Sequence, residues 1–271
     1  MDEKEHTLTG NIQSHPQFPS RILRNERDVL VYLPTGYRRA PRRRYPVLYL
    51  HDGQNIFDAA TSFGGVEWGA DESAQRLIRQ RLIEPIIIVA VANLGGERIH
   101  EYAPTRGVID ASAKRKKRSR GRLAKYGRFL SEELKPFIDQ TYRTKPEAEF
   151  TGLGGSSLGG LATLVLGLWF PQVFGRLAVM SPSIWWDDCA LYRIVDEIKE
   201  KPSLKIWLDT GTHEPGWERA AVLRDKLVEV GWRLYDDLQF TEVEGADHSE
   251  GAWAARFEAV LRFLYPPPPP V

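Results

Sequence analysis

The sequence predicts an α/β protein with a mostly parallel central sheet flanked by helices on both faces. Three observations indicate this: apolar runs of strand length, helical periodicity between them, and a chain length that suits one large core. The run Ile86–Val91 is apolar at every position, which is typical of a strand buried on both faces of a parallel sheet. At 271 residues, without an internal repeat or a shift in composition, the chain is expected to form one domain over 1–271.

The predicted strands are short apolar runs that begin after Asp28. They are 29–33, 47–50, 86–92, 148–152, 177–181, 204–209 and 238–243. Between them, apolar residues recur at three- and four-residue steps, as on one face of a helix. These helical segments are 123–138, 158–169, 192–199, 218–230 and 251–264. Strands that alternate with helices of this length imply βαβ crossovers and therefore parallel pairing.

The two ends of the chain stand outside this alternation. Residues 1–20 are polar and interrupted by proline, which indicates a poorly ordered lead-in or an edge hairpin. Residues 266–270 are all proline, so the tail 266–271 cannot donate backbone hydrogen bonds there and is expected to be extended and solvated.

Composition and charge narrow the class of protein. The chain has 37 basic and 36 acidic residues, and this balance argues against nucleic acid or a membrane surface as the main partner. No apolar run approaches the roughly 18 residues of a membrane span. The first residues lack the layout of a secretory signal, and Cys189 is the only cysteine, so no intrachain disulfide can form. We therefore expect a cytoplasmic protein.

A candidate nucleophile lies in the turn Gly155–Gly159, which reads Gly-Ser-Ser-Leu-Gly. In the pattern Gly-x-Ser-x-Gly between a strand and a helix, flanking glycines let the two elements approach closely while the serine is held on a sharp turn. The spacing selects Ser157 as the nucleophile, with Ser156 as its rival. The alternative, a simple connecting turn, needs fewer glycines than this segment contains.

The candidate base and acid follow the serine in chain order. A serine hydroxyl needs a base, and of the two histidines after Ser157, His248 lies in a polar loop between the last strand and the last helix. For the acid, Glu214 stands in the loop after the strand 204–209, where its carboxylate can reach an imidazole. Asp209, at the end of that strand, is the alternative.

Backbone N–H groups are expected to stabilise the oxyanion. One is that of Leu158, the first residue after the nucleophile. The other candidate is that of Gln54, in the loop His51–Asn55, where a glycine permits close approach of the backbone.

Several other side chains are candidates for the walls of the site. Trp185 and Trp186 follow the strand 177–181 and are expected to form an apolar wall, Trp186 more so, with core packing as the alternative. Trp68 and Asp71 are expected to cap the cleft. The basic run 114–122 is expected to be a solvated loop, with a lid or an attractor of anionic substrates as the alternative.

Six segments together resemble the putative esterase family, which includes esterase D-like, feruloyl-esterase-like and enterochelin-esterase-like enzymes. They are Leu50–Asn55, Asn93–Arg98, Glu101–Pro104, Glu133–Asp139, the serine turn and Ser181–Trp186. The resemblance spans roughly residues 20–265 and implies an α/β-hydrolase fold with no metal and no organic cofactor. It also implies that Ser157 is the nucleophile, His248 the base and Glu214 the acid.

The sequence thus predicts a carboxylesterase-type serine hydrolase that acts on a small-molecule ester, with short acyl or aryl groups favoured because no apolar lid segment is evident. Two alternatives remain open at this stage. One is acyl transfer to an alcohol acceptor at the same site. The other is a non-catalytic binding protein that keeps the fold. The physiological ester and the oligomeric state are not predicted.

Overall fold

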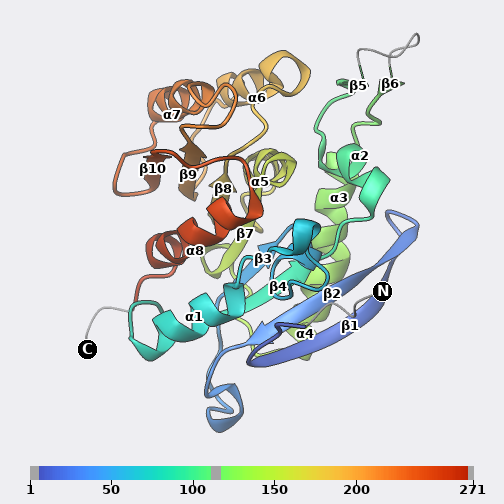
Figure 1. Ribbon diagram of the computed structural model, residues 1–271, viewed down its shortest axis with the longest axis vertical. Coiled ribbons are helices and arrows are strands. Elements are labelled where there is room, and N and C mark those ends of the chain that lie inside the picture. The colour runs from blue at the N-terminus through green and yellow to red at the C-terminus, as the bar shows by residue number, and fades with distance from the viewer. Residues whose placement is uncertain (1–5, 111–116, 268–271) are drawn as a thin grey trace.

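The central feature of the computed structural model, which describes residues 6–110 and 117–267, is an eight-stranded sheet (Figure 1). Its strand order is β1-β2-β4-β3-β7-β8-β9-β10. The strands are β1 (Asn11–Ser20), β2 (Asn25–Leu33), β3 (Val47–Leu50), β4 (Ile87–Val91), β7 (Thr151–Ser156), β8 (Arg176–Met180), β9 (Lys205–Gly211) and β10 (Leu238–Val243). Pairing is antiparallel from β1 to β4 and parallel from β4 to β10. The prediction of a mostly parallel sheet is confirmed.

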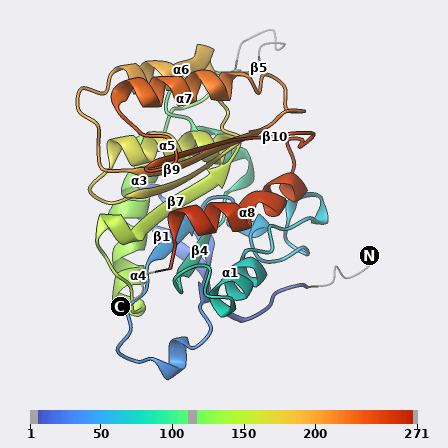
Figure 2. The same ribbon diagram turned by 90° about the vertical axis from the view of Figure 1, so that its left-hand side faces the viewer.

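Helices cover both faces of the sheet, as predicted. They are α1 (Ala70–Arg79), α2 (Arg98–Tyr102), α3 (Leu123–Arg128), α4 (Lys135–Thr141), α5 (Leu158–Trp169), α6 (Trp186–Asp196), α7 (Arg219–Val230) and α8 (Glu250–Leu264). Figure 2 shows α1 and α8 together on one side of the sheet, with α3 and α4 on the other. Buried residues of α5, α6 and α7 belong to the same core cluster as those of α3 and α4.

The period of two along each strand divides the core between these faces. In β3, Val47 and Tyr49 pack into the core under α3 to α7, whereas Leu48 and Leu50 pack into the core under α1 and α8. Both sets are fully or almost fully buried. A strand buried on both faces must be apolar at every position, which is why β3 and β4 carry uninterrupted apolar sequences.

The strand that leads to the serine turn lies later in the chain than predicted. The segment 148–152 was expected to be this strand, but Ala148–Phe150 form a 3₁₀ turn and β7 runs on to Ser156. Its glycines are explained by close packing, which leaves no room for a side chain: a Cβ at Gly154 would lie 2.8 Å from the Ala178 Cβ. Glycine usually weakens a strand, so the composition of 152–156 does not predict that β7 continues through these residues.

The predicted helix 123–138 is interrupted. A π-helical stretch at Phe129–Leu134 separates α3 from α4, and Pro136 follows directly in the first turn of α4. Proline has no backbone N–H to donate, so the regular α-helical hydrogen bonding is interrupted at Pro136, directly after the π-helical stretch. The apolar face nevertheless stays buried over the whole segment.

At the N-terminal end, the hairpin alternative is the one found. Strand β1 pairs with β2 at the edge of the sheet, and the register shifts between His15 and Phe18. Pro16 lies within this shift, where a missing N–H costs no ladder bond. Residues 1–5 and the tail residues 268–271 lie outside the described residues.

The basic run 114–122 is more structured than expected in its described part. Residues 114–116 lie outside that part, but β6 (Lys117–Arg118) pairs with β5 (Val108–Asp110) in a small separate sheet. Farther along, Arg120 and Arg122 both form ion pairs with Glu97 at 3.1 Å. This part of the run is therefore held to the loop that precedes α2.

Among the described residues, none of the helices combines the length and the apolarity needed to span a bilayer.

Helix α5 approaches β8 so closely that Gly160 has no room for a side chain. A Cβ there would lie 2.6 Å from the Met180 carbonyl oxygen, a backbone atom that cannot move alone. We expect Gly160→Ala to lower the free energy of unfolding by about 1–3 kcal/mol, measured by urea denaturation. Gly96→Ala is the matched control, since nothing lies within 4 Å of that position. Equal stability of the two variants would contradict this account.

Candidate active site

Ser157 lies on a strained turn between β7 and α5. Its backbone φ is 58° and its ψ is −121°, a region that residues with a Cβ rarely occupy. The turn is held by a hydrogen bond from the Ser157 N–H to the Met180 carbonyl, at 3.1 Å. It is also packed against Gly155, where a Cβ would lie 3.0 Å from the His51 ring. The predicted sharp turn is thus present, and the Leu158 N–H stands in the first turn of α5, where it has no intrahelical acceptor.

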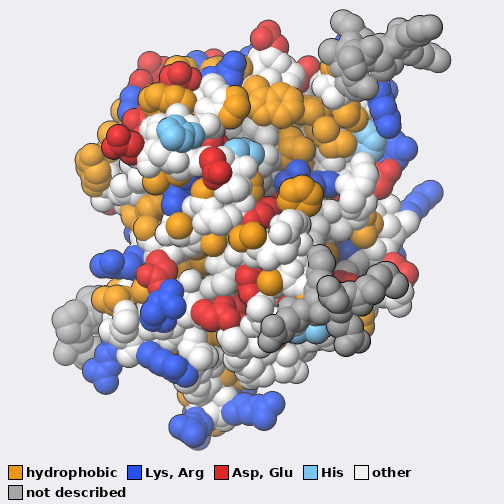
Figure 3. All heavy atoms as spheres, viewed as in Figure 1, with side chains coloured by type: hydrophobic (Ala, Val, Ile, Leu, Met, Phe, Trp, Pro, Cys, Tyr) orange, Lys and Arg blue, Asp and Glu red, His pale blue; other side chains and the backbone are white. Residues whose placement is uncertain are grey.

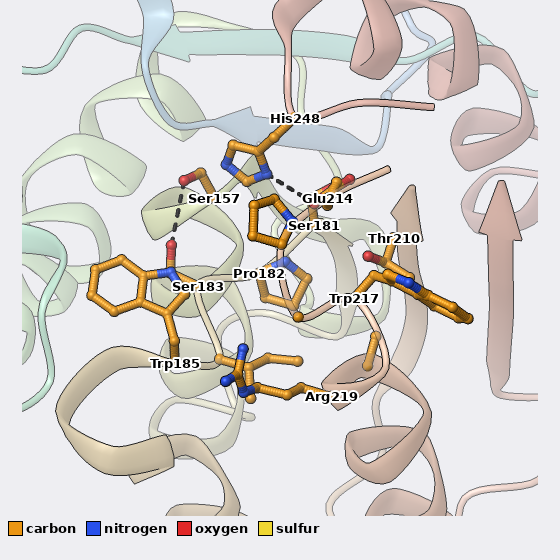
Figure 4. Close-up of a pocket in the computed structure, with 14 residues that line it drawn as sticks. Ser157, Ser181, Pro182, Ser183, Trp185, Thr210, Glu214, Trp217, Arg219 and His248 are labelled. Carbon is orange, nitrogen blue, oxygen red and sulfur yellow. Dashed lines mark hydrogen bonds and ion pairs between the residues drawn. The ribbon is translucent and has the colours of Figure 1, made fainter. Parts of the chain in front are cut away.

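His248 and Glu214 meet in front of this turn. His248 Nδ1 and Glu214 Oε2 are 2.8 Å apart, although 34 positions separate them in sequence. The histidine is in the loop after β10, and the glutamate is in the loop after β9. Both loops leave the carboxyl edge of the parallel sheet, the edge at which β7 delivers Ser157 (Figure 4).

The Glu214 carboxylate is buried, only 7% exposed, yet its environment favours the ionised form. Burial by itself would raise the pKa of this carboxyl. Hydrogen bonds from His248, from the Ser181 hydroxyl and from the Gly211 N–H outweigh burial and lower the pKa below its ordinary value. These hydrogen bonds therefore favour the ionised carboxylate of Glu214, the form that can accept a hydrogen bond from His248.

A buried polar cluster behind Glu214 centres on Ser181. Its hydroxyl donates to Glu214 Oε1 at 2.5 Å and accepts from Trp253 Nε1 at 3.0 Å and from Arg256 Nη2 at 2.8 Å. Trp253 and Arg256 both come from α8, so the last helix is bonded to the loop that carries the acid. This cluster fixes the side of Glu214 that does not face His248.

Asp209, the alternative acid, has other partners. It is fully buried within β9, which continues to Gly211; its carboxylate accepts a hydrogen bond from Trp207 Nε1 at 2.7 Å and lies 3.3 Å from Arg256 Nη2. Burial raises the pKa of Asp209 to about 6, against the opposing effect of Arg256. Between the two carboxylates, Glu214 is the one that contacts His248.

The Ser157 hydroxyl points into the pocket. Among the described residues its hydrogen-bond partner is Ser183, with 3.3 Å between the two oxygens (Figure 4). His248 lines the same pocket as Ser157. Contacts of this kind in free enzymes are often loose and tighten only when substrate binds.

The loop that carries Gln54 is clamped in place. Asp52, whose φ is 57°, accepts both Arg98 Nε and Nη2 at 2.7 Å and Asn93 Nδ2 at 2.7 Å. Burial alone would raise the pKa of Asp52, but the Arg98 charge lowers it. At the next residue, Gly53, a Cβ would lie 2.6 Å from the Val91 N–H nitrogen. The Gln54 N–H therefore stands on a rigid turn at the rim of the site.

Two hollows meet at Ser157 and His248. The first has a volume of about 660 Å³ and is largely apolar, with Ile184, Trp185 and Trp217 in its walls. The second, of about 780 Å³, is apolar to a similar extent, but more charged and amide side chains contribute to its lining. It includes Asp52, Gln54, Asn55, Asn93, Arg98, Glu250, Phe63 and Val66. Figure 3 shows hydrophobic side chains gathered on this face between α6 and the β5–β6 hairpin.

Of the predicted aromatic walls, only Trp185 is found in a hollow. It is 53% exposed and lines the first hollow, whereas Trp186 is 1% exposed and donates its Nε1 hydrogen to Thr105. The expectation for Trp186 is wrong because successive residues at a helix start point in different directions. Its ring fills the space beside Gly107 instead.

Trp68 and Asp71 do not cap the cleft either. Trp68 is 3% exposed, packs against Phe257 and donates its Nε1 hydrogen to Glu250 at 2.5 Å. Asp71 is 1% exposed and accepts hydrogen bonds from Thr9. Both expectations are wrong, since Trp68 packs against α8 and Asp71 is bonded to the N-terminal segment.

Some residues of the site were not singled out from the sequence. Ser181 and Ser183 lie in the segment Ser181–Trp186, and a serine on each side of a proline just past a strand end was an available signal. Arg256 had no such signal, because an arginine on an amphipathic helix normally faces solvent.

Comparison with known protein families identifies the family of this chain. The family model described as "Putative esterase" matches residues 20–264. The chain belongs to this family. It is thus an enzyme that hydrolyses esters, and the resemblance inferred from the motifs is confirmed.

Two proteins of Bacillus subtilis are similar to most of the chain. The chain is 30% identical over 206 residues to the uncharacterized protein YjcH of Bacillus subtilis, covering 76% of this chain and 74% of that one. It is 25% identical to the ferri-bacillibactin esterase BesA of Bacillus subtilis, covering 89% and 87% of the two chains.

A solved structure described as the BES protein from Bacillus cereus superposes with a TM-score of 0.74 at 24% identity, covering 97% of this chain and 99% of that one. The enterobactin esterase FES from Shigella flexneri gives 0.73 at 20% identity, covering 95% and 61%. These structures support the α/β-hydrolase fold of the family.

The pH dependence of stability tests the state of Glu214. A carboxyl whose folded pKa lies below its ordinary 4.5 stabilises the fold above that pH, and this contribution disappears as the pH falls through the folded pKa. We expect the free energy of unfolding of the wild type to fall more steeply than that of Glu214→Gln between about pH 5 and pH 3. Urea unfolding at each pH measures this.

Glu218→Gln, at an exposed carboxylate in the same loop region, is the matched control and should follow the wild type. Parallel pH profiles for wild type and Glu214→Gln would show that the hydrogen bonds to Glu214 do not favour its ionised form.

Proposed function

We propose that this esterase is a serine carboxylic-ester hydrolase that works through an acyl-enzyme, with Ser157, His248 and Glu214 as its catalytic triad. The observation that carries the proposal is the 2.8 Å contact between Glu214 and His248 beside a serine on a strained strand–helix turn. These three residue types in these roles are what nucleophilic attack by a weakly acidic hydroxyl requires.

The reaction begins with attack by Ser157 Oγ on the ester carbonyl carbon while His248 Nε2 takes the hydroxyl proton. Glu214 holds Nδ1, which selects the tautomer with Nε2 free and stabilises the imidazolium. The N–H groups of Gln54 and Leu158 bind the oxyanion. The alcohol leaves with the proton from His248, and water then attacks the acyl carbon by the same sequence of proton transfers.

For the first step, the Ser157 hydroxyl must turn from Ser183 toward His248. The two serine oxygens are 3.3 Å apart, which is a weak contact for two hydroxyls. Its loss costs little, and the stronger bond to the imidazole replaces it when substrate displaces water from the pocket.

The hollows support a small ester with an apolar part and a polar part. The walls that Ile184, Trp185 and Trp217 form in the first hollow suit a short acyl chain or an aryl ring. The charged and amide side chains in the lining of the second hollow suit the more hydrophilic portion. Similar proteins include a feruloyl esterase and siderophore esterases, whose substrates differ from one another, so the hollows are the better guide to the ester.

Removal of the nucleophile or the base tests the mechanism. We expect Ser157→Ala and His248→Asn each to lower kcat for a para-nitrophenyl acetate-type ester by about 10³-fold or more. His213→Asn is the matched control, because His213 is the other histidine after Ser157 and is exposed outside both hollows. Its turnover should stay within about twofold of wild type, a change of less than about 0.5 kcal/mol.

A fluorophosphonate probe identifies the nucleophile independently of turnover. Mass spectrometry of the labelled protein should place the adduct on Ser157 and on neither Ser156 nor Ser183. Wild-type turnover by Ser157→Ala would sink the proposal, and an adduct on Ser156 would reassign the nucleophile. Absence of labelling together with absence of turnover would instead favour a binding protein.

Substitution of Trp185 tests whether the first hollow binds the aryl group of the ester. Trp185→Ala should raise KM for an aryl-acyl ester about 5- to 30-fold, since about 1–2 kcal/mol of apolar burial is lost, and should leave KM for an acetyl ester nearly unchanged. Trp169→Ala, at a tryptophan 40% exposed on the end of α5, is the control. Equal changes for both esters would place the aryl group elsewhere.

A further inference from the structure

The first hollow is larger than a short acyl group requires. Its volume of about 660 Å³ lies in the range of pockets that enclose whole drug-sized ligands. Figure 4 shows Ser157 and His248 at one end of the residues that line it and Arg219 at the other. An acyl group long enough to fill the hollow would therefore extend from Ser157 toward Arg219.

The lining of this hollow contains one permanently charged cation. Among the described residues that line it, Arg219 is the one arginine or lysine, and Glu214 is the one carboxylate. Glu214 already interacts with His248. The walls are otherwise formed largely by apolar side chains. The hollow therefore offers a ligand apolar walls and, away from Ser157, a single positive charge.

The guanidinium of Arg219 has free hydrogen-bond donors. Within residues 6–110 and 117–267, no carboxylate forms an ion pair with it, and its side-chain nitrogens donate no hydrogen bond. Arg219 is exposed, so these donors face solvent until a ligand arrives. A planar guanidinium matches the two oxygens of a carboxylate through two parallel N–H···O bonds. Arg219 can therefore bind an anion without first breaking a bond to the protein.

Arg219 is held in place by the loop that carries the acid. Its N–H donates to the Gly216 carbonyl at 3.2 Å, and its carbonyl accepts from the Tyr192 hydroxyl, on α6, at 2.9 Å. The Trp217 N–H donates to the Glu214 carbonyl at 3.2 Å in the same loop. The guanidinium lies so close to Gly216 that a Cβ there would overlap Nη1. Packing and backbone bonds thus position the side chain while its donors stay available.

We propose that the acyl group of the physiological ester ends in a carboxylate, and that Arg219 binds this carboxylate while the esterified carboxyl group lies at Ser157. The substrate class is then a half-ester of a dicarboxylic acid with an apolar middle. This inference rests on the proposed function, because it takes the acyl group to bind in the first hollow. One cation balances one negative charge, whereas a phosphate monoester carries about two at neutral pH and would require more.

The hydrocarbon middle of such an acyl group would contact the walls between the two ends. In Figure 4, Pro182 and the rings of Trp185 and Trp217 lie between Ser157 and Arg219. A neutral acyl chain gains the same apolar contacts, so these contacts do not distinguish the two kinds of ester. Recognition of charge at Arg219 is what separates a half-ester from a neutral ester of equal length.

Paired esters test this assignment with the unchanged protein. The para-nitrophenyl half-esters of glutaric, adipic and pimelic acids are compared with the para-nitrophenyl esters of pentanoic, hexanoic and heptanoic acids, in which a methyl group replaces the carboxylate. After correction for spontaneous hydrolysis, at least one half-ester should show a KM about 5- to 20-fold below that of its neutral partner, between the effects of an exposed ion pair and of a hydrogen bond to a buried charge. Added NaCl should reduce this preference, because salt screens an exposed charge.

Replacement of Arg219 tests the residue itself. Arg219→Gln should remove this preference by raising KM for the half-ester, with kcat and the KM for neutral esters within about twofold of wild type. Arg219→Lys keeps the charge but not the planar pair of donors, so it should retain part of the preference. Arg233→Gln, at an exposed arginine paired with Asp236 outside both hollows, is the matched control and should behave like wild type.

Binding measurements separate this inference from the proposed function. Monoethyl adipate and ethyl hexanoate are titrated calorimetrically into Ser157→Ala and into Ser157→Ala combined with Arg219→Gln. The first protein should bind the half-ester more tightly than the neutral ester, and the second should bind both equally. Equal affinity of Ser157→Ala for the two esters, or an unchanged preference without Arg219, would overturn the inference and leave the triad untouched. Wild-type turnover by Ser157→Ala would instead contradict the proposed function.

Discussion

The rest of the site depends on the close approach of β7, α5 and β8 around Ser157. The positive φ of Ser157 costs about 1–3 kcal/mol in backbone strain. Such a conformation persists only where the surrounding packing allows the chain no other path. Here Gly155 lies against His51 and Gly160 lies against the Met180 carbonyl. Without side chains at these two points, helix and strands come close enough to project the serine hydroxyl above the sheet.

The same closeness fixes the acid. Ser181 follows β8 directly, and its position beside the serine turn lets its hydroxyl bond at once to Glu214 and to two residues of α8. The loops after β8 and β9 and the helix after β10 are thereby tied together by one buried hydroxyl. Such a network is costly when it is incomplete, so it favours a single arrangement in which the imidazole of His248 has one place to bind.

On the other side of Ser157, an ion pair holds the turn that carries Gln54 in place. Arg98 grips the Asp52 carboxylate with two nitrogens, and Asp52 holds the turn that presents Gln54. The second hollow, beyond this turn, is bounded by the loop before α1, which is itself bonded to the N-terminal segment through acidic side chains. Aromatic side chains thus form much of the wall of the first hollow, and charged and amide side chains hold the turn at the wall of the second.

The sequence by itself determined the alternation of strands and helices, because burial imposes periods of 2 and 3.6 on local sequence. It also determined the order in which Ser157, Glu214 and His248 follow strand ends, and the structure brings these three residues together. Parallel strands end at one edge of the sheet, so residues that follow them meet whatever the length of chain between them.

Only the tertiary structure decided which tryptophan faces a hollow and where Trp68 and Asp71 point. It also showed that β7 continues through its glycines, and that Arg256 donates a hydrogen bond to the buried Ser181 hydroxyl. Each of these depends on contacts between residues far apart in the chain. The local pattern around such a residue is the same whether its side chain faces solvent or a distant element, so periodicity carries no information about it.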